Sequence, residues 1–290
     1  MPVPLPRHDR AIAAMGTALG PEMLDACRAL YDAEQRALMA RVAPVAVDCE
    51  YGPHPRHRLD IYAPAGEKGL PVGLPVVLFV HGGGFRMGDK GGADQWQNAA
   101  VGRMAAEAGF VGAVMNYRLV PDAAWPDGAH DVIAAIDWLR ANVAAHGGSA
   151  ERIVAMGTSA GAVHVAGAIR ERADLPVRGA VLLSGLYGHT PLEERDIAYY
   201  GPQADYPARC PRDAVAQTAL PLMVACAQFD PPRFQTEFLA LMHGRLAWHG
   251  TMPRGLIVPG HNHYSLAMHL GTADRRLADE IAAFVNDCCA

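Results

Sequence analysis

The 290-residue sequence predicts an α/β fold with a mostly parallel central sheet and helices on both faces. Between residues 75 and 184, short apolar runs alternate with longer segments of helical periodicity, as in parallel strands joined by crossover helices. The run 75–80 is apolar without interruption, which is typical of a strand covered on both faces. We therefore expect one large domain over residues 45–290, preceded by a helical extension over residues 1–44.

The composition argues against several classes of protein. The net charge is −5 and the 25 lysines and arginines are scattered, so we expect no nucleic-acid partner. No apolar run approaches the ~18 residues of a membrane span, and residues 1–10 lack the apolar core of a signal peptide. The six cysteines show no metal-binding spacing. This cysteine usage favours a reduced, cytoplasmic protein.

Residues 9–41 have the pattern of two helices. Gly20 and Pro21 separate them, and proline suits the first position of the second helix. The sequence leaves two interpretations of this extension open: a helix packed on the edge of the domain, or a flap over a functional site.

Two strands, 45–50 and 58–62, form a predicted hairpin. The joint between them is rich in proline and glycine. We therefore expect its histidines, His54 and His57, to face solvent. Residues 63–74 have the composition of a Gly/Pro loop.

Three consecutive glycines follow the buried strand 75–80, in the stretch His81-Gly82-Gly83-Gly84-Phe85. Because glycine has no side chain, the amides of such a loop can approach a ligand closely. The alternation of elements then continues, with helices expected over residues 93–108, 128–146 and 162–172, and strands over 110–116, 153–156 and 176–184.

The stretch Gly157-Thr158-Ser159-Ala160-Gly161 joins a predicted strand to a predicted helix. A tight turn there points the serine hydroxyl away from the sheet, and glycines on either side avoid clashes. The N-terminal amides of the helix favour negative charge beside Ser159. This pattern is the nucleophile elbow of the α/β-hydrolases, and an upstream His-Gly-Gly-Gly is the oxyanion loop of lipases and esterases.

The alternation of strands and helices stops over residues 185–218, which we interpret as an inserted segment on the substrate side of the domain. Beyond that segment we expect strands over 220–229 and 254–258, helices over 233–248 and 273–288, and a loop over 260–265.

A serine nucleophile needs a base within hydrogen-bond reach, and the base needs a carboxylate that fixes its tautomer. Ser159, Asp230 and His263 meet the hydrolase order Ser, Asp, His, and each partner comes just after a predicted strand. Other carboxylates fit less well. Asp205 and Asp213 lie in the irregular segment, and the two that precede the serine are Asp127 and Asp131; we expect Asp131 to be a structural partner on its helix.

Two histidines compete for the role of base. We favour His263, which opens the turn after the last strand, and expect His261 to shape the loop or touch substrate. An x-His-x-His pair also occurs in metal sites, but no further ligands are evident near it in the sequence. We therefore expect no metal.

The developing oxyanion needs preorganised donors, and we expect them to be the amides of Ala160, Gly83 and Gly84. No cofactor is required. Candidates for an apolar substrate pocket are Phe85, Met87, Trp96, Trp125 and Tyr187, with His261 beside them.

From about residue 45 to the C-terminus the chain resembles the α/β-hydrolase carboxylesterases of the hormone-sensitive-lipase-like and bacterial feruloyl/acyl esterase groups. The stretches that carry the resemblance are Leu59-Asp60-Ile61-Tyr62, His81-Gly82-Gly83-Gly84-Phe85, Asn116-Tyr117-Arg118-Leu119, Gly157-Thr158-Ser159-Ala160-Gly161, Asp230-Pro231-Pro232 and Asn262-His263-Tyr264-Ser265. The resemblance implies hydrolysis of carboxylic esters through an acyl-enzyme, and its last stretch also favours His263. The chain departs from it at Thr158, where acidic or histidine residues are frequent, and at Ala162, where glycine is frequent.

We accordingly expect a serine carboxylesterase that acts on a small or medium-sized ester. An amide hydrolase of the arylformamidase type is the nearest alternative, because it uses the same acyl-transfer chemistry. A non-catalytic small-molecule-binding homologue would require a broken triad. An exposed edge strand or the C-terminal helix offers a surface for a homodimer.

Overall fold

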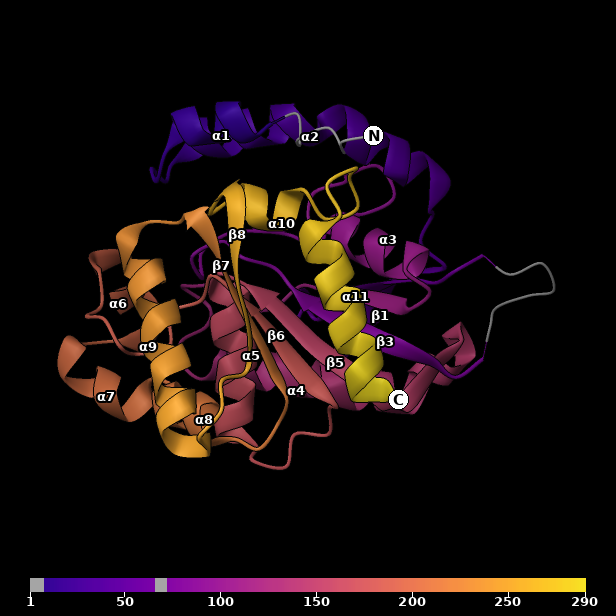
Figure 1. The fold of residues 1–290 in the computed structure, drawn as a ribbon. Helices are drawn as coiled ribbons and strands as arrows, with labels where there is room; N and C mark the ends of the chain where they lie inside the picture. The colour runs from indigo at the N-terminus through magenta and orange to yellow at the C-terminus, as the bar shows by residue number, and fades with distance from the viewer. Residues whose placement is uncertain (1–7, 66–71) are drawn as a thin grey trace.

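An eight-stranded sheet forms the centre of the computed structural model, which describes residues 8–65 and 72–290 (Figure 1). Its strands are β1 (Ala46–Glu50), β2 (Arg58–Tyr62), β3 (Leu74–Val80), β4 (Val111–Met115), β5 (Gly148–Thr158), β6 (Gly179–Leu183), β7 (Leu222–Phe229) and β8 (Arg254–Asn262). The order across the sheet is β1-β2-β4-β3-β5-β6-β7-β8. Only β1 and β2 pair antiparallel with their neighbours, so the predicted fold class is confirmed.

The helices that surround this sheet are α1 (Asp9–Met15), α2 (Pro21–Arg41), α3 (Ala99–Glu107), α4 (Asp127–Asn142), α5 (Ala160–Glu171), α6 (Glu194–Tyr200), α7 (Tyr206–Arg209), α8 (Arg212–Gln217), α9 (Pro232–His249), α10 (Ser265–Met268) and α11 (Arg276–Cys289), with 3₁₀ turns η1 (Val143–His146) and η2 (Gln203–Asp205). Among the described residues, no helix is both long and apolar enough to span a bilayer. Residues 1–7, which belong to the predicted extension, and residues 66–71 of the predicted 63–74 loop lie outside the described residues.

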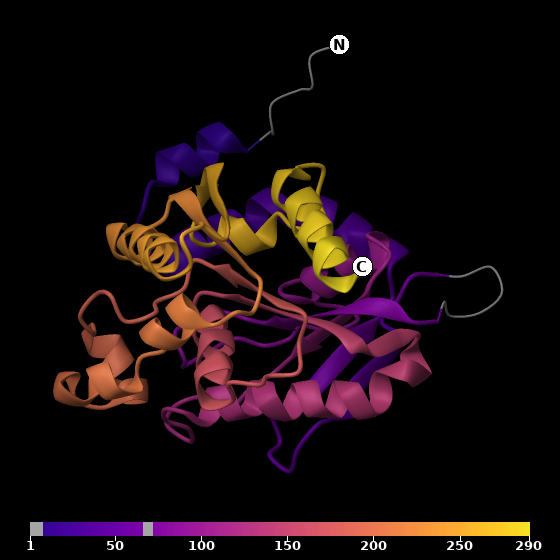
Figure 2. The ribbon, with the colours of Figure 1, turned by 60° about the horizontal axis from the view of Figure 1, so that its bottom comes forward.

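Two hydrophobic cores lie on opposite faces of the sheet. Alternate residues of β3 enter different cores, with Leu78 on one face and Phe79 on the other, because successive side chains of a strand point to opposite faces. Apolar side chains of α4, α5 and α9 pack on the first face. Those of α3 and α11 pack on the second, and Figure 2 shows α4 and α11 on opposite sides of the sheet.

The N-terminal helices lie across the turn that follows β8 (Figure 1). The side-chain amide of Gln35, on α2, donates to the carbonyl oxygens of Met268 and Leu270 at 2.8 and 2.9 Å. The amide of Gly20, just before α2, donates to the hydroxyl of Tyr264 at 3.0 Å. The extension is thereby attached to the segment that carries His263.

Two element boundaries differ from the prediction. The helix predicted over 93–108 begins only at Ala99, because Asn98 adopts a φ of 55°, a left-handed conformation that stops a helix and that asparagine tolerates. The last strand extends past Val258 to Asn262, because residue 262 still pairs with Phe229 of β7. His261, predicted in a loop, therefore lies within β8.

The prediction that His57 faces solvent is wrong. His57 is 7% exposed, stacks on Tyr51, and its Nε2 lies 3.1 Å from Oδ1 of Asp131. Burial lowers the pKa of His57, against the opposing effect of Asp131. Asp131 also accepts hydrogen bonds from Arg118, so it joins both the β1–β2 turn, through His57, and the loop after β4 to α4. This is the structural role expected of it.

A buried carboxylate holds the start of the irregular segment that follows β6. Glu237, on α9, is fully buried, and its oxygens accept hydrogen bonds from four consecutive amides, those of residues 187–190, at 2.7–3.2 Å. The hydroxyl of Thr190 donates to the same carboxylate at 2.5 Å. Five donors around one side chain fix this segment against α9.

Replacing Glu237 with alanine is expected to lower the free energy of unfolding by ~3 kcal/mol or more, because several buried amides lose their acceptor. Urea unfolding checks this, with Glu280→Ala as the control. Glu280 is exposed on α11, and its loss is expected to cost less than ~0.5 kcal/mol. Equal effects of the two substitutions would contradict the structural role of Glu237.

Candidate active site

Ser159 lies at the crossing from β5 to α5 and has a strained backbone, with φ 52° and ψ −121°. The crossing is tight: a Cβ on Gly161 would overlap the carbonyl oxygen of Val80, and one on Gly157 would overlap the backbone of Gly161. Non-glycine residues rarely hold such angles unless the surrounding structure imposes them. This geometry is that of a nucleophile elbow, as the sequence predicted.

The structure brings Ser159, His263 and Asp230 together. Nε2 of His263 lies 3.0 Å from the hydroxyl oxygen of Ser159, and Nδ1 lies 2.7 Å from Oδ1 of Asp230. Asp230 is fully buried and His263 is 8% exposed. Since the carboxylate accepts the Nδ1 hydrogen, the lone pair on Nε2 faces the serine hydroxyl, which is the arrangement required of a general base.

Ser184, which was not among the predicted site residues, helps to orient Asp230. Its hydroxyl donates to Oδ2 of Asp230 at 2.5 Å, and the amide of Ala227 donates to the same oxygen at 2.7 Å. These two bonds leave Oδ1 for His263. The one signal in the sequence was that Ser184 ends a predicted strand beside the one that carries Asp230.

The glycine loop after β3 lies beside Ser159. Gly83 and Gly84 have φ values of 135° and 58°, and a Cβ on Gly83 would overlap the carbonyl oxygen of Met87. Within the described chain, the amides of Gly83 and Gly84 donate to no protein acceptor. Ala160 begins α5, where a backbone amide has no intrahelical partner. All three residues line the same cavity as Ser159, so their amides are available to an anion there.

Two buried histidines, His81 and His164, pack beside this glycine loop. His81 stacks on Tyr117 with ring centroids 4.4 Å apart, and Tyr117 donates its hydroxyl to the carbonyl oxygen of His81 at 2.9 Å. His164 packs edge-on against the other face of this group, at Tyr117 and Phe85. Burial lowers the pKa of His81 to about 4 and that of His164 to about 3, so both rings are uncharged at neutral pH.

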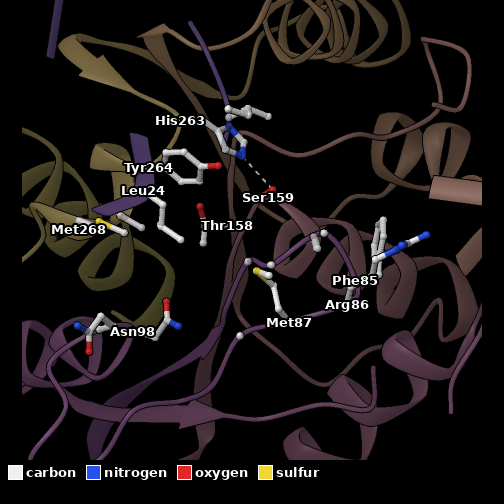
Figure 3. A pocket seen from close by; sticks show the side chains of 18 of the residues that line it. Leu24, Phe85, Arg86, Met87, Asn98, Thr158, Ser159, His263, Tyr264 and Met268 are labelled. Carbon is white, nitrogen blue, oxygen red and sulfur yellow. Dashed lines mark hydrogen bonds between the residues drawn. The ribbon is translucent and has the colours of Figure 1, made fainter. Parts of the chain in front are cut away.

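A cavity of about 380 Å³ opens at Ser159 (Figure 3). Leu19 and Leu24 of the N-terminal extension form part of its wall, which favours the interpretation of this extension as a cover over the site. The cavity is also lined by the apolar or long side chains of Phe85, Met87, Trp96, Val101, Tyr264 and Met268.

Three of the predicted pocket residues do not line this cavity. Tyr187 is 1% exposed and belongs to the core. Trp125 stacks on Tyr200 with ring centroids 5.3 Å apart and packs against the hydrophobic cluster to which Phe85 belongs, without lining the cavity itself. His261 is 1% exposed and points into a buried polar cluster. The sequence showed that these side chains are large or polar, but it could not predict whether they point into the cavity.

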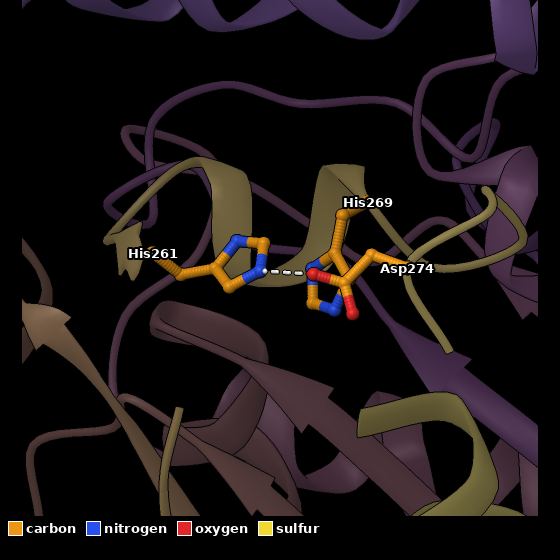
Figure 4. Close-up of side chains that lie close together, drawn as sticks. All are labelled: His261, His269 and Asp274. Carbon is orange, nitrogen blue, oxygen red and sulfur yellow. Dashed lines mark hydrogen bonds and ion pairs between the residues drawn. The ribbon is translucent and has the colours of Figure 1, made fainter. Parts of the chain in front are cut away.

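The sequence showed no further metal ligands near His261, but the fold brings two potential ligands to it. His261, in β8, and His269 and Asp274, in the chain that follows, place donor atoms within 4.8 Å of one another (Figure 4). However, Arg276 already binds the carboxylate of Asp274 with Nε and Nη2 at 2.9 and 2.6 Å. Burial alone would raise the pKa of Asp274, but hydrogen bonds from Arg276 and His261 hold it below its usual range. A bound cation would have to compete with this guanidinium.

Comparison with known proteins agrees with this geometry. Residues 59–172 match the family model described as BD-FAE. A probable isoprenylcysteine alpha-carbonyl methylesterase of Oryza sativa is 42% identical over 116 residues, which are 40% of this chain and 25% of that protein. The bile salt-activated lipase of Mus musculus is 34% identical over 134 residues, 42% of this chain and 22% of that protein. The chain thus spans about a quarter of the length of these relatives.

Solved structures of esterases share the whole fold. An esterase of Pyrobaculum calidifontis superposes with a TM-score of 0.71 at 22% identity and covers 99% of this chain and 100% of its own. An arylesterase superposes with a TM-score of 0.66 at 22% identity, covering 94% and 99%. The chain therefore has the α/β-hydrolase fold. The proteins that it matches are named as esterases and lipases, which confirms the resemblance to the α/β-hydrolase carboxylesterases.

The buried histidines predict a loss of stability in acid. Desolvation lowers the pKa of His81 to about 4 and that of His164 and His269 to about 3, from 6.5. Between these values the unfolded chain binds protons that the folded chain does not. The contribution of these histidines to the free energy of unfolding is therefore complete above about pH 6.5. It declines as the pH falls, by ~1 kcal/mol per histidine between about pH 7 and 5.5.

Urea unfolding at these two pH values measures the decline, and His164→Asn isolates one contribution to it. In this variant, the decrease in the free energy of unfolding that the three histidines cause between the two pH values is expected to be about one third smaller. An identical pH dependence in wild type and variant would contradict the assignment.

Proposed function

We propose that this protein is a serine carboxylesterase that hydrolyses small to medium-sized carboxylic esters through an acyl-enzyme. The observation that carries the proposal is the hydrogen-bonded series from Ser159 to His263 to Asp230, with distances of 3.0 and 2.7 Å, at the end of an apolar cavity. The named esterases with the same fold support it.

In the proposed reaction, the hydroxyl oxygen of Ser159 attacks the ester carbonyl while Nε2 of His263 takes its proton. His263 then gives the proton to the leaving alcohol, and an acyl group remains on the serine. Water, activated by the same histidine, releases the acid and restores the enzyme. Asp230 holds the imidazole in the required tautomer throughout and stabilises its protonated form.

We assign the stabilisation of the negative charge on the carbonyl oxygen to the amides of Gly83, Gly84 and Ala160. The amides of Gly83 and Gly84 have no protein acceptor among the described residues, and Ala160 stands at the start of α5, where an amide has no intrahelical partner. Each such donor contributes on the order of 3 kcal/mol to the stability of the transition state. In this mechanism His263 carries out the proton transfers, and backbone amides of this chain stabilise the developing negative charge.

The cavity supports an apolar substrate group of moderate size. Its volume of about 380 Å³ falls in the range of small-molecule sites. Its wall away from Ser159 consists largely of aliphatic, thioether and aromatic side chains, among them Leu24, Trp96 and Met268. We assign this space to the acyl chain, with Leu24 of α2 as one of the residues that limit its length.

Initial rates on p-nitrophenyl acetate and butyrate test the proposed reaction. Ser159→Ala is expected to lower kcat by ~10⁴-fold or more, because the nucleophile is lost. Ser149→Ala, at the opposite end of β5, provides a control with the same chemical change and is expected to keep wild-type rates. Full activity of Ser159→Ala would rule out the assignment, and turnover of N-formylkynurenine but not of esters would favour an amide hydrolase.

The role of Leu24 predicts a change in substrate preference. Leu24→Trp fills the cavity and is expected to lower kcat/KM for p-nitrophenyl octanoate ~10-fold relative to the acetate, since the larger acyl group loses its apolar contacts. Leu239→Trp makes the same change on the exposed face of α9 and should leave the ratio unaltered. A parallel change for both esters in Leu24→Trp would show that the acyl chain binds elsewhere.

A further inference from the structure

A second histidine–carboxylate pair lies two residues before His263. His261, at the end of β8, is 1% exposed, and both of its ring nitrogens have partners. Nε2 lies 3.1 Å from Oδ2 of Asp274 (Figure 4). Nδ1 lies 3.1 Å from the hydroxyl oxygen of Ser265. Both partners follow His263 in the sequence, Ser265 at the start of α10 and Asp274 just before α11.

The partners determine the direction of each hydrogen bond. Asp274 is an acceptor, because Arg276 holds it as a carboxylate through two bonds. Nε2 of His261 therefore carries the hydrogen, and in a neutral ring Nδ1 is then the acceptor. The hydroxyl oxygen of Ser265 lies 3.1 Å from Nδ1 and 3.3 Å from the carbonyl oxygen of Asn262, and it accepts the amide hydrogen of Asn262 at 2.9 Å. The result is one hydrogen-bonded series from the backbone at residue 262 to Arg276.

This series closes a turn around His263. The side chain of Asn262 accepts the amides of Tyr264 and Ser265 at 3.2 and 3.0 Å, so three amides of the turn are bound by side chains of the turn itself. His269, directly after α10, adds a contact: its ring stacks on His261 with centroids 3.9 Å apart, and its Nδ1 donates to the carbonyl oxygen of Ser265 at 2.8 Å. A buried and fully bonded turn of this kind has little freedom to move.

We propose that His261 is a positioning residue for His263. Through Ser265 on one side and Asp274 on the other, it fixes the turn so that the imidazole of His263 meets Ser159 and Asp230 together. His261 touches neither the cavity nor the reacting atoms, and its effect passes through the backbone of residues 262–265. This inference rests on the proposed function of His263 as the base.

The same cluster has the ligand types of a metal site, and the contacts of Asp274 decide between the two roles. The guanidinium of Arg276 is bound to both oxygens of this carboxylate, repels a second cation and occupies the oxygens that a metal would use. Hydrogen bonds join His261 to Asp274 and to Ser265, whereas the ring of His269 only stacks on His261, and its Nε2 has no partner among the described residues. The hydrogen bonds therefore account for the arrangement of His261 and Asp274 without an ion.

Four variants separate the two arms of the network. His261→Phe keeps an aromatic ring and removes both bonds; His261→Gln keeps a donor toward Asp274, and His261→Asn keeps an acceptor toward Ser265. Ser265→Ala removes the second arm together with the bonds of this hydroxyl to the backbone of Asn262. The controls are His243→Gln on the exposed face of α9 and Ser149→Ala at the start of β5.

The expected result is a loss of kcat with little change in KM. His261→Phe is expected to lower kcat for p-nitrophenyl butyrate roughly 100-fold, because misplacement of a catalytic group by about 1 Å has an effect of this size. The Gln, Asn and Ser265→Ala variants should fall between it and wild type, while the controls keep full activity. Wild-type kcat in Ser265→Ala and in both single-arm variants would overturn the proposal.

A proton NMR measurement distinguishes this failure from failure of the proposed function. The hydrogen shared by His263 and Asp230 is expected at low field in the folded protein, whatever the substrate. It should shift or broaden in His261→Phe and Ser265→Ala and stay unchanged in Ser149→Ala. An unaltered resonance in the first two would contradict positioning even if no ester is turned over. Activity that requires added Zn²⁺ and disappears with a chelator would also contradict it.

Discussion

The hydrogen bond between the buried carboxylate of Asp230 and Nδ1 of His263 is the interaction on which the rest of the site depends. A carboxylate without exposure is costly unless every oxygen has partners, and here Ser184 and the amide of Ala227 occupy the oxygen that His263 does not use. The carboxylate can then present one oxygen in one direction. That direction sets the imidazole, and the imidazole faces Ser159, whose own position is imposed by the tight crossing from β5 to α5.

The parts of the chain farthest from Ser159 in sequence complete its surroundings. The N-terminal extension brings Leu19, from the link between α1 and α2, and Leu24, from α2, to the cavity. Gln35 and Gly20 bind this extension to the segment that follows β8. The wall of the cavity at Ser159 and the support of His263 are therefore one connected structure. Under the proposed function, a change in this extension is expected to affect both substrate preference and the position of the base.

Much of the fold and the central residues of the site could be predicted from sequence because they depend on local patterns. Uninterrupted apolar runs defined the buried strands, and Ser159 and the glycines before Phe85 stand in motifs whose backbone geometry demands small residues. Asp230 and His263 could be proposed as partners of Ser159 because parallel strands place their carboxyl ends at one edge of the sheet, and the structure brings all three side chains together there.

The remaining features depend on packing between distant segments, which no local pattern encodes. His57 was expected in solvent, yet it is buried against Asp131 on a helix 74 positions further along the chain. Trp125 and Tyr187 are large apolar residues that were expected in the pocket, but Tyr187 belongs to the core and Trp125 stacks on Tyr200, so neither lines the cavity. His261 gained its role from Asp274 and Ser265, whose distances could be known only after the turn had folded.

The central claim is that Ser159 forms a covalent acyl intermediate with His263 as its base. Rapid mixing with p-nitrophenyl butyrate, an acid quench and peptide mass spectrometry test it most directly. The account predicts that the peptide containing Ser159 gains the mass of one butyryl group before steady state, and that Ser159→Ala gains none. Turnover of the ester with an unmodified Ser159 peptide at every time point, or a butyryl group on another residue in its place, would contradict it.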